Sequence, residues 1–103
     1  MCSVRRLALV LCLAAPLAQA VEPDLPRNLA ATCANCHGTE GRSAGGMASL
    51  AGEPRERLLA KLRAYAAGEE PSTIMGQIAR GYSEAQLALI AGWFAAQPGR
   101  REP

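Results

Sequence analysis

The chain has few of the residues that usually hold metal ions or cross-link small proteins. Its 103 residues contain one histidine, His37, and four cysteines, of which Cys2 and Cys12 lie within the first twenty positions. A structural zinc site takes four ligands, and beyond Cys33, Cys36 and His37 the residues 21–103 offer no further Cys or His. A disulfide between Cys33 and Cys36 would close too short a loop to constrain the chain. The composition therefore disfavours a zinc module and a disulfide-stabilised fold.

The pattern of a β-strand is also missing. Apolar residues recur three and four positions apart in much of the chain, and no stretch shows the alternation of a half-buried strand. A thioredoxin-like Cys-x-x-Cys motif stands at the end of a strand in an α/β pattern, so that interpretation of Cys33 and Cys36 is disfavoured. The spacing of the apolar residues predicts an all-α fold.

The sequence has neither a large excess of charge nor a hydrophobic run of membrane-spanning length. Its formal net charge is +2, and it falls to zero once Arg5 and Arg6 are removed. A neutral chain disfavours a nucleic-acid partner. The longest apolar run, Leu7–Leu17, is too short to cross a bilayer as a stable helix.

The first twenty residues have the organisation of an export signal. Arg5 and Arg6 form the basic start, Leu7–Leu17 the apolar run, and Ala18–Ala20 a small-x-small cleavage site. We therefore predict a signal peptide over residues 1–20, a single domain over residues 21–103, a periplasmic location, and no transmembrane segment after the signal is removed. A domain of this size buries too little apolar surface to be comfortably stable without a metal or another cross-link.

The most specific motif is Cys33-Ala34-Asn35-Cys36-His37, the Cys-x-x-Cys-His spacing of covalent haem attachment of the c type. Positions i and i+3 of a helical turn point the same way, so both thiols can reach the two vinyl groups along one haem edge. His37 can then offer a ring nitrogen to the iron. A covalently bound haem would also supply the apolar core that the domain lacks. No internal repeat is visible, so we expect one haem c.

Helical signals surround this motif. Asp24 is expected to cap a helix that has Pro26 in its first turn, presents Cys33 near its C-terminal end and stops at Gly38. Residues 38–52 are rich in Gly, Ser and Thr, and they predict a loop along one side of the haem.

Two further helices and one shorter segment are expected. A second helix follows Pro54 and ends before Gly68, and its buried stripe is Leu58, Leu59, Leu62 and Tyr65. Its solvated face, to which we assign no function, is Arg55, Glu56, Lys61 and Arg63. Residues 73–80 form a short helix or an irregular segment that holds Met75 and Ile78. A Ser83–Gln86 capping box opens the last helix, which ends at Pro98-Gly99 and buries Leu87, Ile90, Ala91 and Phe94.

The second axial ligand of the iron is then the open question. A methionine suits an electron carrier, because a neutral, soft thioether favours ferrous iron. Met47 lies only ten residues after His37, and its loop would have to cross the haem edge. Met75 follows a full helix, which carries the chain to the opposite face, so we favour Met75. An open or water-ligated iron, with either methionine filling the core, is the alternative.

Taken together, these residues resemble the class I cytochromes c of bacterial periplasms. The resemblance rests on four stretches: Cys33–His37 with Gly38, Leu50-Ala51-Gly52, Met75–Ser83, and Trp93-Phe94. It covers residues 25–97. Within the family, the sequence is most similar to the haem domains of small two-haem carriers and to the cytochrome subunit of flavocytochrome c sulfide dehydrogenase.

This resemblance implies an all-α class I cytochrome c fold, in which three main helices and a short one surround a covalently bound haem. The first and last helices cross at one edge of the haem. Cys33 and Cys36 are then the thioether sites, His37 the proximal ligand and Met75 the distal one. The family usually has a proline two residues before Leu50, whose carbonyl accepts the imidazole proton. This chain has Ala48 there, and any backbone carbonyl can accept that bond.

The function implied is outer-sphere transfer of single electrons through the haem edge by a periplasmic monohaem c-type cytochrome. The expected partners are redox proteins, such as a sulfide-oxidising flavoprotein or a terminal oxidase. No catalytic residue is assigned. The alternative is a haem sensor or a small haem enzyme such as a peroxidase, which needs an open distal site.

Overall fold

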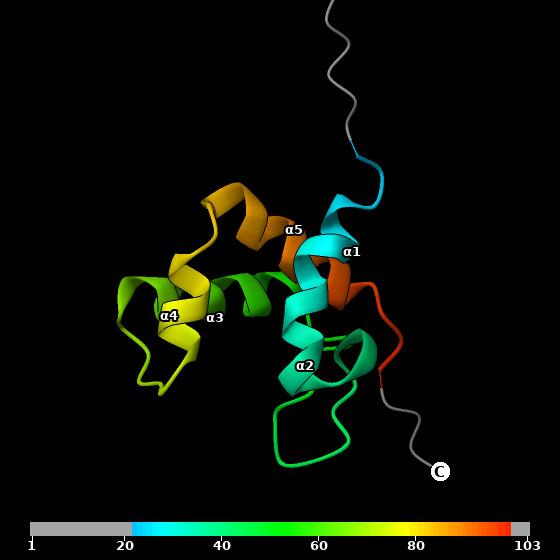
Figure 1. Cartoon of the computed structure of the whole chain (residues 1–103), viewed down its shortest axis with the longest axis horizontal. Coiled ribbons are helices and arrows are strands. Elements are labelled where there is room, and N and C mark those ends of the chain that lie inside the picture. Colours follow the sequence, from blue (N-terminus) through cyan, green and yellow to red (C-terminus); the bar gives the residue numbers. More distant parts are fainter. Residues whose placement is uncertain (1–21, 100–103) are drawn as a thin grey trace, which may run out of the picture.

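The computed structural model describes residues 22–99, and every regular element in that range is helical (Figure 1). The α-helices are α1 (Leu25–Ala30), α2 (Ala34–His37), α3 (Arg55–Ala67), α4 (Met75–Arg80) and α5 (Glu84–Ala95). Two 3₁₀ turns, η1 (Ala31–Cys33) and η2 (Thr39–Gly41), complete them. The predicted all-α class is therefore confirmed for the described range. The signal peptide predicted over residues 1–20 lies outside it.

The first predicted helix is divided into three pieces. The turn η1 separates α1 from α2, so the expectation of one continuous α-helix is wrong, although Ala31 and Ala34 keep right-handed helical dihedral angles. Asp24 precedes α1, but its side chain makes no capping hydrogen bond. Its φ of −95° and ψ of 9° differ from the extended geometry of a capping residue, so the predicted role of Asp24 is wrong.

Glycine ends α2 as predicted. Gly38 has φ +88°, a backbone conformation that residues with a Cβ rarely adopt. A Cβ at this position would lie 2.0 Å from the carbonyl oxygen of Arg42. The chain can therefore turn sharply after His37 only because residue 38 has no side chain.

The two long helices have the predicted starts. Helix α3 follows Pro54, and Gly68 ends it in the left-handed conformation. At the start of α5, the Gln86 N–H donates to Ser83 Oγ at 3.2 Å and the Ser83 N–H donates to Gln86 Oε1 at 2.8 Å, which confirms the capping box. The end predicted at Pro98 is wrong, because α5 stops at Ala95. Beyond it, the Gln97 side-chain amide donates to the carbonyl of Trp93 at 2.9 Å and satisfies that group.

The segment between these helices is the short helix α4. Helix α4 spans Met75–Arg80, so of the two forms expected for residues 73–80 the structure has the helical one. Within the described residues, no helix is both long and apolar enough to cross a membrane.

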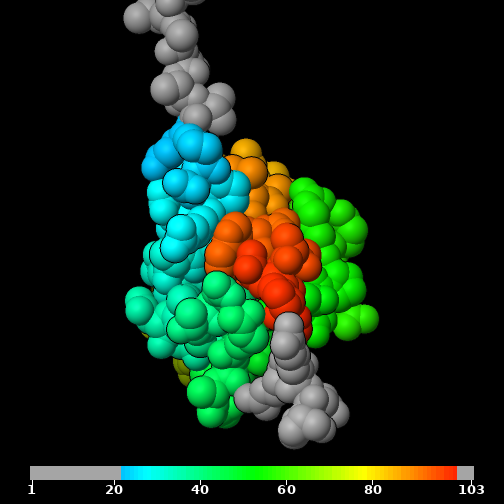
Figure 2. All heavy atoms as spheres, turned by 90° about the vertical axis from the view of Figure 1, so that its right-hand side faces the viewer, coloured from blue at the N-terminus to red at the C-terminus, as the bar shows by residue number. Residues whose placement is uncertain are grey.

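Helix α5 holds the domain together. It packs against α1 on one side and α3 on the other, and α3 also packs against α4. The close packing of the first and last helices is thus confirmed. Figure 2 shows the end of α5 and the residues after it (orange to red) between the N-terminal helices (blue to cyan) and α3 (green). The buried apolar residues of the core are Ala30, Ala51, Leu59, Ala79, Leu87, Ile90, Ala91 and Phe94.

Candidate functional site

The predicted ligands meet at a cavity of about 130 Å³. Cys33 from η1, His37 from α2 and Met75 from α4 all line it, although α3 and two loops separate the first two from the third in sequence. The remaining lining is mostly apolar, from the loop, α3 and α5: Ala48, Leu50, Leu58, Leu62, Ile90, Ala91 and Phe94. Lys61 and Tyr65 of α3 complete the lining.

A second, smaller cavity of about 50 Å³ shares Cys33, His37 and Met75 with the first. It adds Cys36, Met47 and three side chains near the surface, Thr32, Ile74 and Ile78. The structure thus brings all four predicted site residues, Cys33, Cys36, His37 and Met75, around one pair of adjoining cavities.

The His37 imidazole is buried, with 9% of its surface exposed, and its orientation is fixed. Its Nδ1 lies 2.6 Å from the carbonyl oxygen of Ala48. A carbonyl can only accept a hydrogen bond, so Nδ1 carries a proton, and in the neutral ring Nε2 is the nitrogen with the lone pair. The imidazole is therefore in the tautomer that a metal ligand needs, and the carbonyl of Ala48 accepts the bond as the family resemblance implied.

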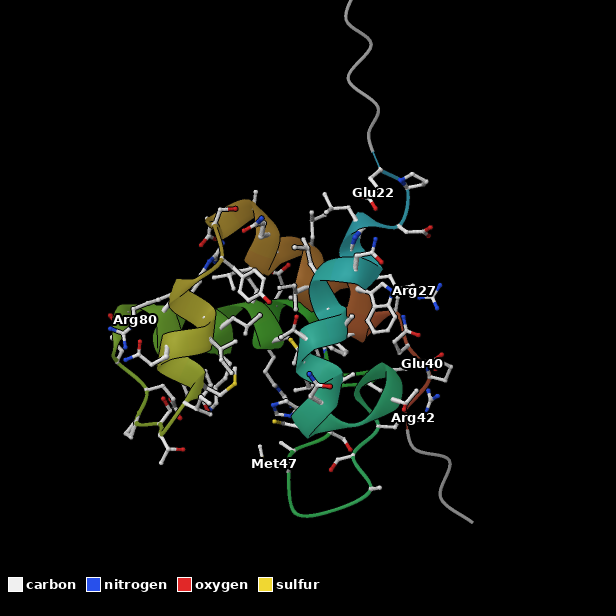
Figure 3. All side chains as sticks on the ribbon, viewed as in Figure 1. Glu22, Arg27, Glu40, Arg42, Met47 and Arg80 are labelled. Carbon is white, nitrogen blue, oxygen red and sulfur yellow. The ribbon has the colours of Figure 1, made fainter. Side chains whose placement is uncertain are left out.

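This bond also places Met47. Because Ala48 is tied to His37, its neighbour Met47 is held on the side of the imidazole, on the loop below α2 in Figure 3. The Met47 side chain is 47% exposed. Met75 instead comes from α4 and is half-buried. The two methionines thus reach the small cavity from different elements.

Three side-chain and backbone groups hold the first turn of α4 around Met75. The Gly76 N–H donates to Ser72 Oγ at 2.9 Å, and Arg80 Nε donates to the carbonyl of Gly76 at 2.9 Å. A Cβ on Gly76 would lie 3.3 Å from Ser72 Oγ and 3.4 Å from Arg80. Ser72 and Gly76 thus position Met75. Neither residue was among the predicted site residues, although a serine shortly before a short helix is a recognisable capping signal.

Both cysteines of the motif are free thiols, and they differ in environment. Cys36 is exposed, whereas Cys33 is half-buried, and burial raises the pKa of the Cys33 thiol. The two are not joined to each other. Among residues 22–99, no group of three or more His, Cys, Asp or Glu side chains is arranged to hold a metal ion.

The chemistry of this donor set fits an iron porphyrin. An imidazole nitrogen and a thioether sulfur are a recognised pair of axial ligands for haem iron. The free thiols Cys33 and Cys36 lie beside the imidazole, where they can form thioether bonds. The mainly apolar lining suits a large, flat and mostly apolar group.

The position of Lys61 was predicted only in part. Its side chain is 57% exposed, as expected of the solvated face of α3, but it also lines the larger cavity. Its Nζ lies 3.0 Å from Glu70 Oε1, and this hydrogen bond raises the pKa of Lys61 above its usual value. A helical periodicity could not reveal this, because Lys61 sits at the border between the buried and exposed faces of α3.

No family model matches the chain. Comparison with known proteins nevertheless gives several named relatives. The chain is 35% identical over 81 residues to the cytochrome subunit of sulfide dehydrogenase from Chlorobaculum tepidum, covering 79% of this chain and 74% of that protein. It is 36% identical over 84 residues to the thiosulfate dehydrogenase electron acceptor of Thiomonas intermedia, covering 80% of this chain and 37% of that one.

A third relative is cytochrome c-552 of Acidithiobacillus ferridurans, which is 32% identical over 63 residues. That match covers 61% of this chain and 27% of the relative. The chain thus spans about three quarters of the first relative and no more than 37% of the other two. Given the extent of the first match and the cavity residues described above, the chain belongs to the class I cytochrome c-like proteins.

Proposed function

We propose that this protein is a periplasmic monohaem c-type cytochrome that transfers single electrons. In this proposal Cys33 and Cys36 hold the haem through thioether bonds, and His37 and Met75 are its axial ligands. The observation that carries the proposal is the meeting of one correctly protonated imidazole, one thioether and two free thiols at adjoining cavities with a mainly apolar lining. When bound, the haem supplies one-electron chemistry through its iron.

The protein's own residues then set the conditions for that chemistry. The Ala48 carbonyl holds the His37 ring in place and makes Nε2 a better donor. Ser72 fixes the backbone beside Met75. Leucine and isoleucine side chains exclude water from the cavity and keep its dielectric constant low, which limits the reorganisation that accompanies electron transfer. Filling both axial positions would keep oxygen and substrates from the iron.

The partners proposed for this chain are redox proteins of inorganic sulfur oxidation. One relative is named as the cytochrome subunit of sulfide dehydrogenase and another as the electron acceptor of thiosulfate dehydrogenase. We infer that the electron donor is an enzyme that oxidises a reduced sulfur compound, with a sulfide-oxidising flavoprotein as the first to test. A terminal oxidase is the proposed acceptor. The export signal predicted over residues 1–20 supports a periplasmic location.

The ligand assignment is tested by replacing each methionine in turn. Met75→Ala should abolish the near-infrared absorption band of the ferric iron–thioether bond. Met47→Ala, the matched control, should leave the band unchanged. If the band persists in Met75→Ala, the axial assignment is wrong; if it vanishes in Met47→Ala alone, Met47 is the ligand.

The partner assignment needs a separate measurement. Reduced sulfide-oxidising flavoprotein should reduce the cytochrome rapidly in a stopped-flow experiment, as followed by the visible absorption of the haem. Slow reduction would reject that donor while leaving the cytochrome assignment intact. A high-spin ferric spectrum together with fast carbon monoxide binding by the reduced protein would instead favour the haem sensor or small haem enzyme.

A further inference from the structure

The larger cavity contains a corner with the chemistry of a carboxylate site. Lys61 and Tyr65 lie four residues apart on α3, so their side chains occupy the same helical face, and both line the cavity. Lys61 offers a positively charged ammonium group and Tyr65 a phenolic hydroxyl. Among the described residues that line the two cavities, Lys61 is the one that is charged at every physiological pH.

This corner does not share a cavity with Cys36, although Cys33 lines both cavities. Cys36 lines only the smaller cavity, together with Met47 and Ile74, whereas Lys61 and Tyr65 line only the larger one. A haem with its vinyl groups on Cys33 and Cys36 presents its two propionates on the other side of the ring. The propionates are its only charged substituents, and burying such a charge without a partner is costly.

We propose that Lys61 and Tyr65 together bind a haem propionate, an assignment that rests on the proposed function. The Lys61 ammonium pairs with the carboxylate, and the Tyr65 hydroxyl donates a hydrogen bond to it. The positive charge of Lys61 offsets the negative charge that the propionate adds near the iron. Lys61 therefore favours the ferrous state and acts as a positioning residue for the haem.

Glu70 is the competitor for the same ammonium group. Its Oε1 lies 3.0 Å from Lys61 Nζ, although Glu70 itself lines neither cavity. A carboxylate at this place repels a propionate and draws Lys61 away from it. Removing the charge of Glu70 should strengthen the contact between Lys61 and the propionate.

Arg63 provides a matched control on the same helix. It is an exposed cation of α3 that pairs with Glu84 of α5, and it lines neither cavity. Arg63→Gln removes the same charge as Lys61→Gln from a neighbouring position. Any effect common to both variants is therefore a general effect of surface charge.

The experiment compares covalently loaded wild type with Lys61→Gln, Lys61→Arg, Tyr65→Phe, Glu70→Gln and Arg63→Gln. The reduction midpoint is measured by spectroelectrochemistry at low ionic strength, and the propionate carboxylate bands by redox difference infrared spectroscopy. Lys61→Gln should lower the reduced-to-oxidised ratio several-fold at a fixed applied potential, and Glu70→Gln should raise it. Lys61→Gln and Tyr65→Phe should both shift the carboxylate bands, while Lys61→Arg and Arg63→Gln should leave them near the wild-type positions.

The outcomes separate this proposal from the one on which it rests. If wild type carries no covalent haem, the proposed function fails. If wild type is loaded but Lys61→Gln matches Arg63→Gln in both measurements, and Tyr65→Phe leaves the carboxylate bands unmoved, the propionate assignment fails and the cytochrome assignment stands. Should Lys61→Gln fail to mature, the bands of Tyr65→Phe decide the matter, because that variant keeps the ring and loses only the hydroxyl.

Discussion

The carbonyl oxygen of Ala48 lies 2.6 Å from Nδ1 of His37, so a loop residue eleven positions away fixes the orientation of the chain's single histidine. The contact uses the backbone of residue 48 and is independent of its side chain. The loop therefore acts on His37 through its backbone conformation, so the stiffness of the loop should affect how firmly the imidazole is held.

Substitutions at Ala48 should change stability without changing ligation. Ala48→Pro keeps the carbonyl and restricts the unfolded chain, so we expect the free energy of unfolding to rise by about 0.4–1 kcal/mol. Ala48→Gly keeps the same carbonyl and should lower it by a similar amount. Denaturant titration checks the stability, and the visible spectrum checks the ligation. A displaced spectrum in Ala48→Pro would show that the loop cannot accept a proline there.

Removing the Ser72 hydroxyl should weaken the bond between Met75 and the iron. The Ser72 Oγ accepts from the Gly76 N–H at 2.9 Å, and the loss of such a contact at a helix start costs about 1 kcal/mol. In Ser72→Ala, the near-infrared thioether band of the ferric protein should vanish at a lower denaturant concentration than global unfolding. Ser72→Thr retains the hydroxyl and should behave as wild type. Identical band loss in Ser72→Ala and wild type would contradict this role.

Gly41 should tolerate no side chain. It has φ +81°, and a Cβ there would lie 2.7 Å from Cδ1 of Phe94, which is 1% exposed and packs edge-on against Trp93. Gly41→Ala should therefore lower the free energy of unfolding by more than the ~1–2 kcal/mol of left-handed strain alone. Gly45→Ala is the control, because no atom lies within 4 Å of a Cβ at that position. Equal stability of the two variants in thermal unfolding would rule out this account of the loop.

A variant without the two motif cysteines should still bind haem, but the haem should no longer be covalently attached. In the Cys33→Ser, Cys36→Ser double variant, acidified organic solvent should extract the haem, while Cys36→Ser alone should retain it through Cys33. The double variant should also be less stable, because the haem is no longer linked covalently to the chain. Pyridine haemochrome spectra measure how much haem is extracted and how much stays with the protein. Retained haem in the double variant would mean that another residue forms the covalent bond.

The sequence by itself predicts the haem-attachment motif and determines where several helices begin and end. The Cys33–His37 spacing predicts haem attachment, Gly38 and Gly68 end their helices because of positive φ, and Ser83 with Gln86 opens the last one. The predicted helix ends and the capping box were confirmed because each depends on residues within a few positions of one another, whereas haem attachment stays a prediction. The predicted cap at Asp24 failed because the backbone there lacks the extended geometry of a capping residue, and the first helix contains the 3₁₀ turn η1.

Only the tertiary structure decided which distant groups meet. It brought Met75 to the cavity that His37 lines, with α3 between them in sequence, and it placed Lys61 and Tyr65 of α3 in the lining of that cavity. The physical reason is that these contacts depend on how α3, α4 and α5 pack around a shared cavity. A periodicity records which face of a helix is apolar, but it does not record which other element that face will touch.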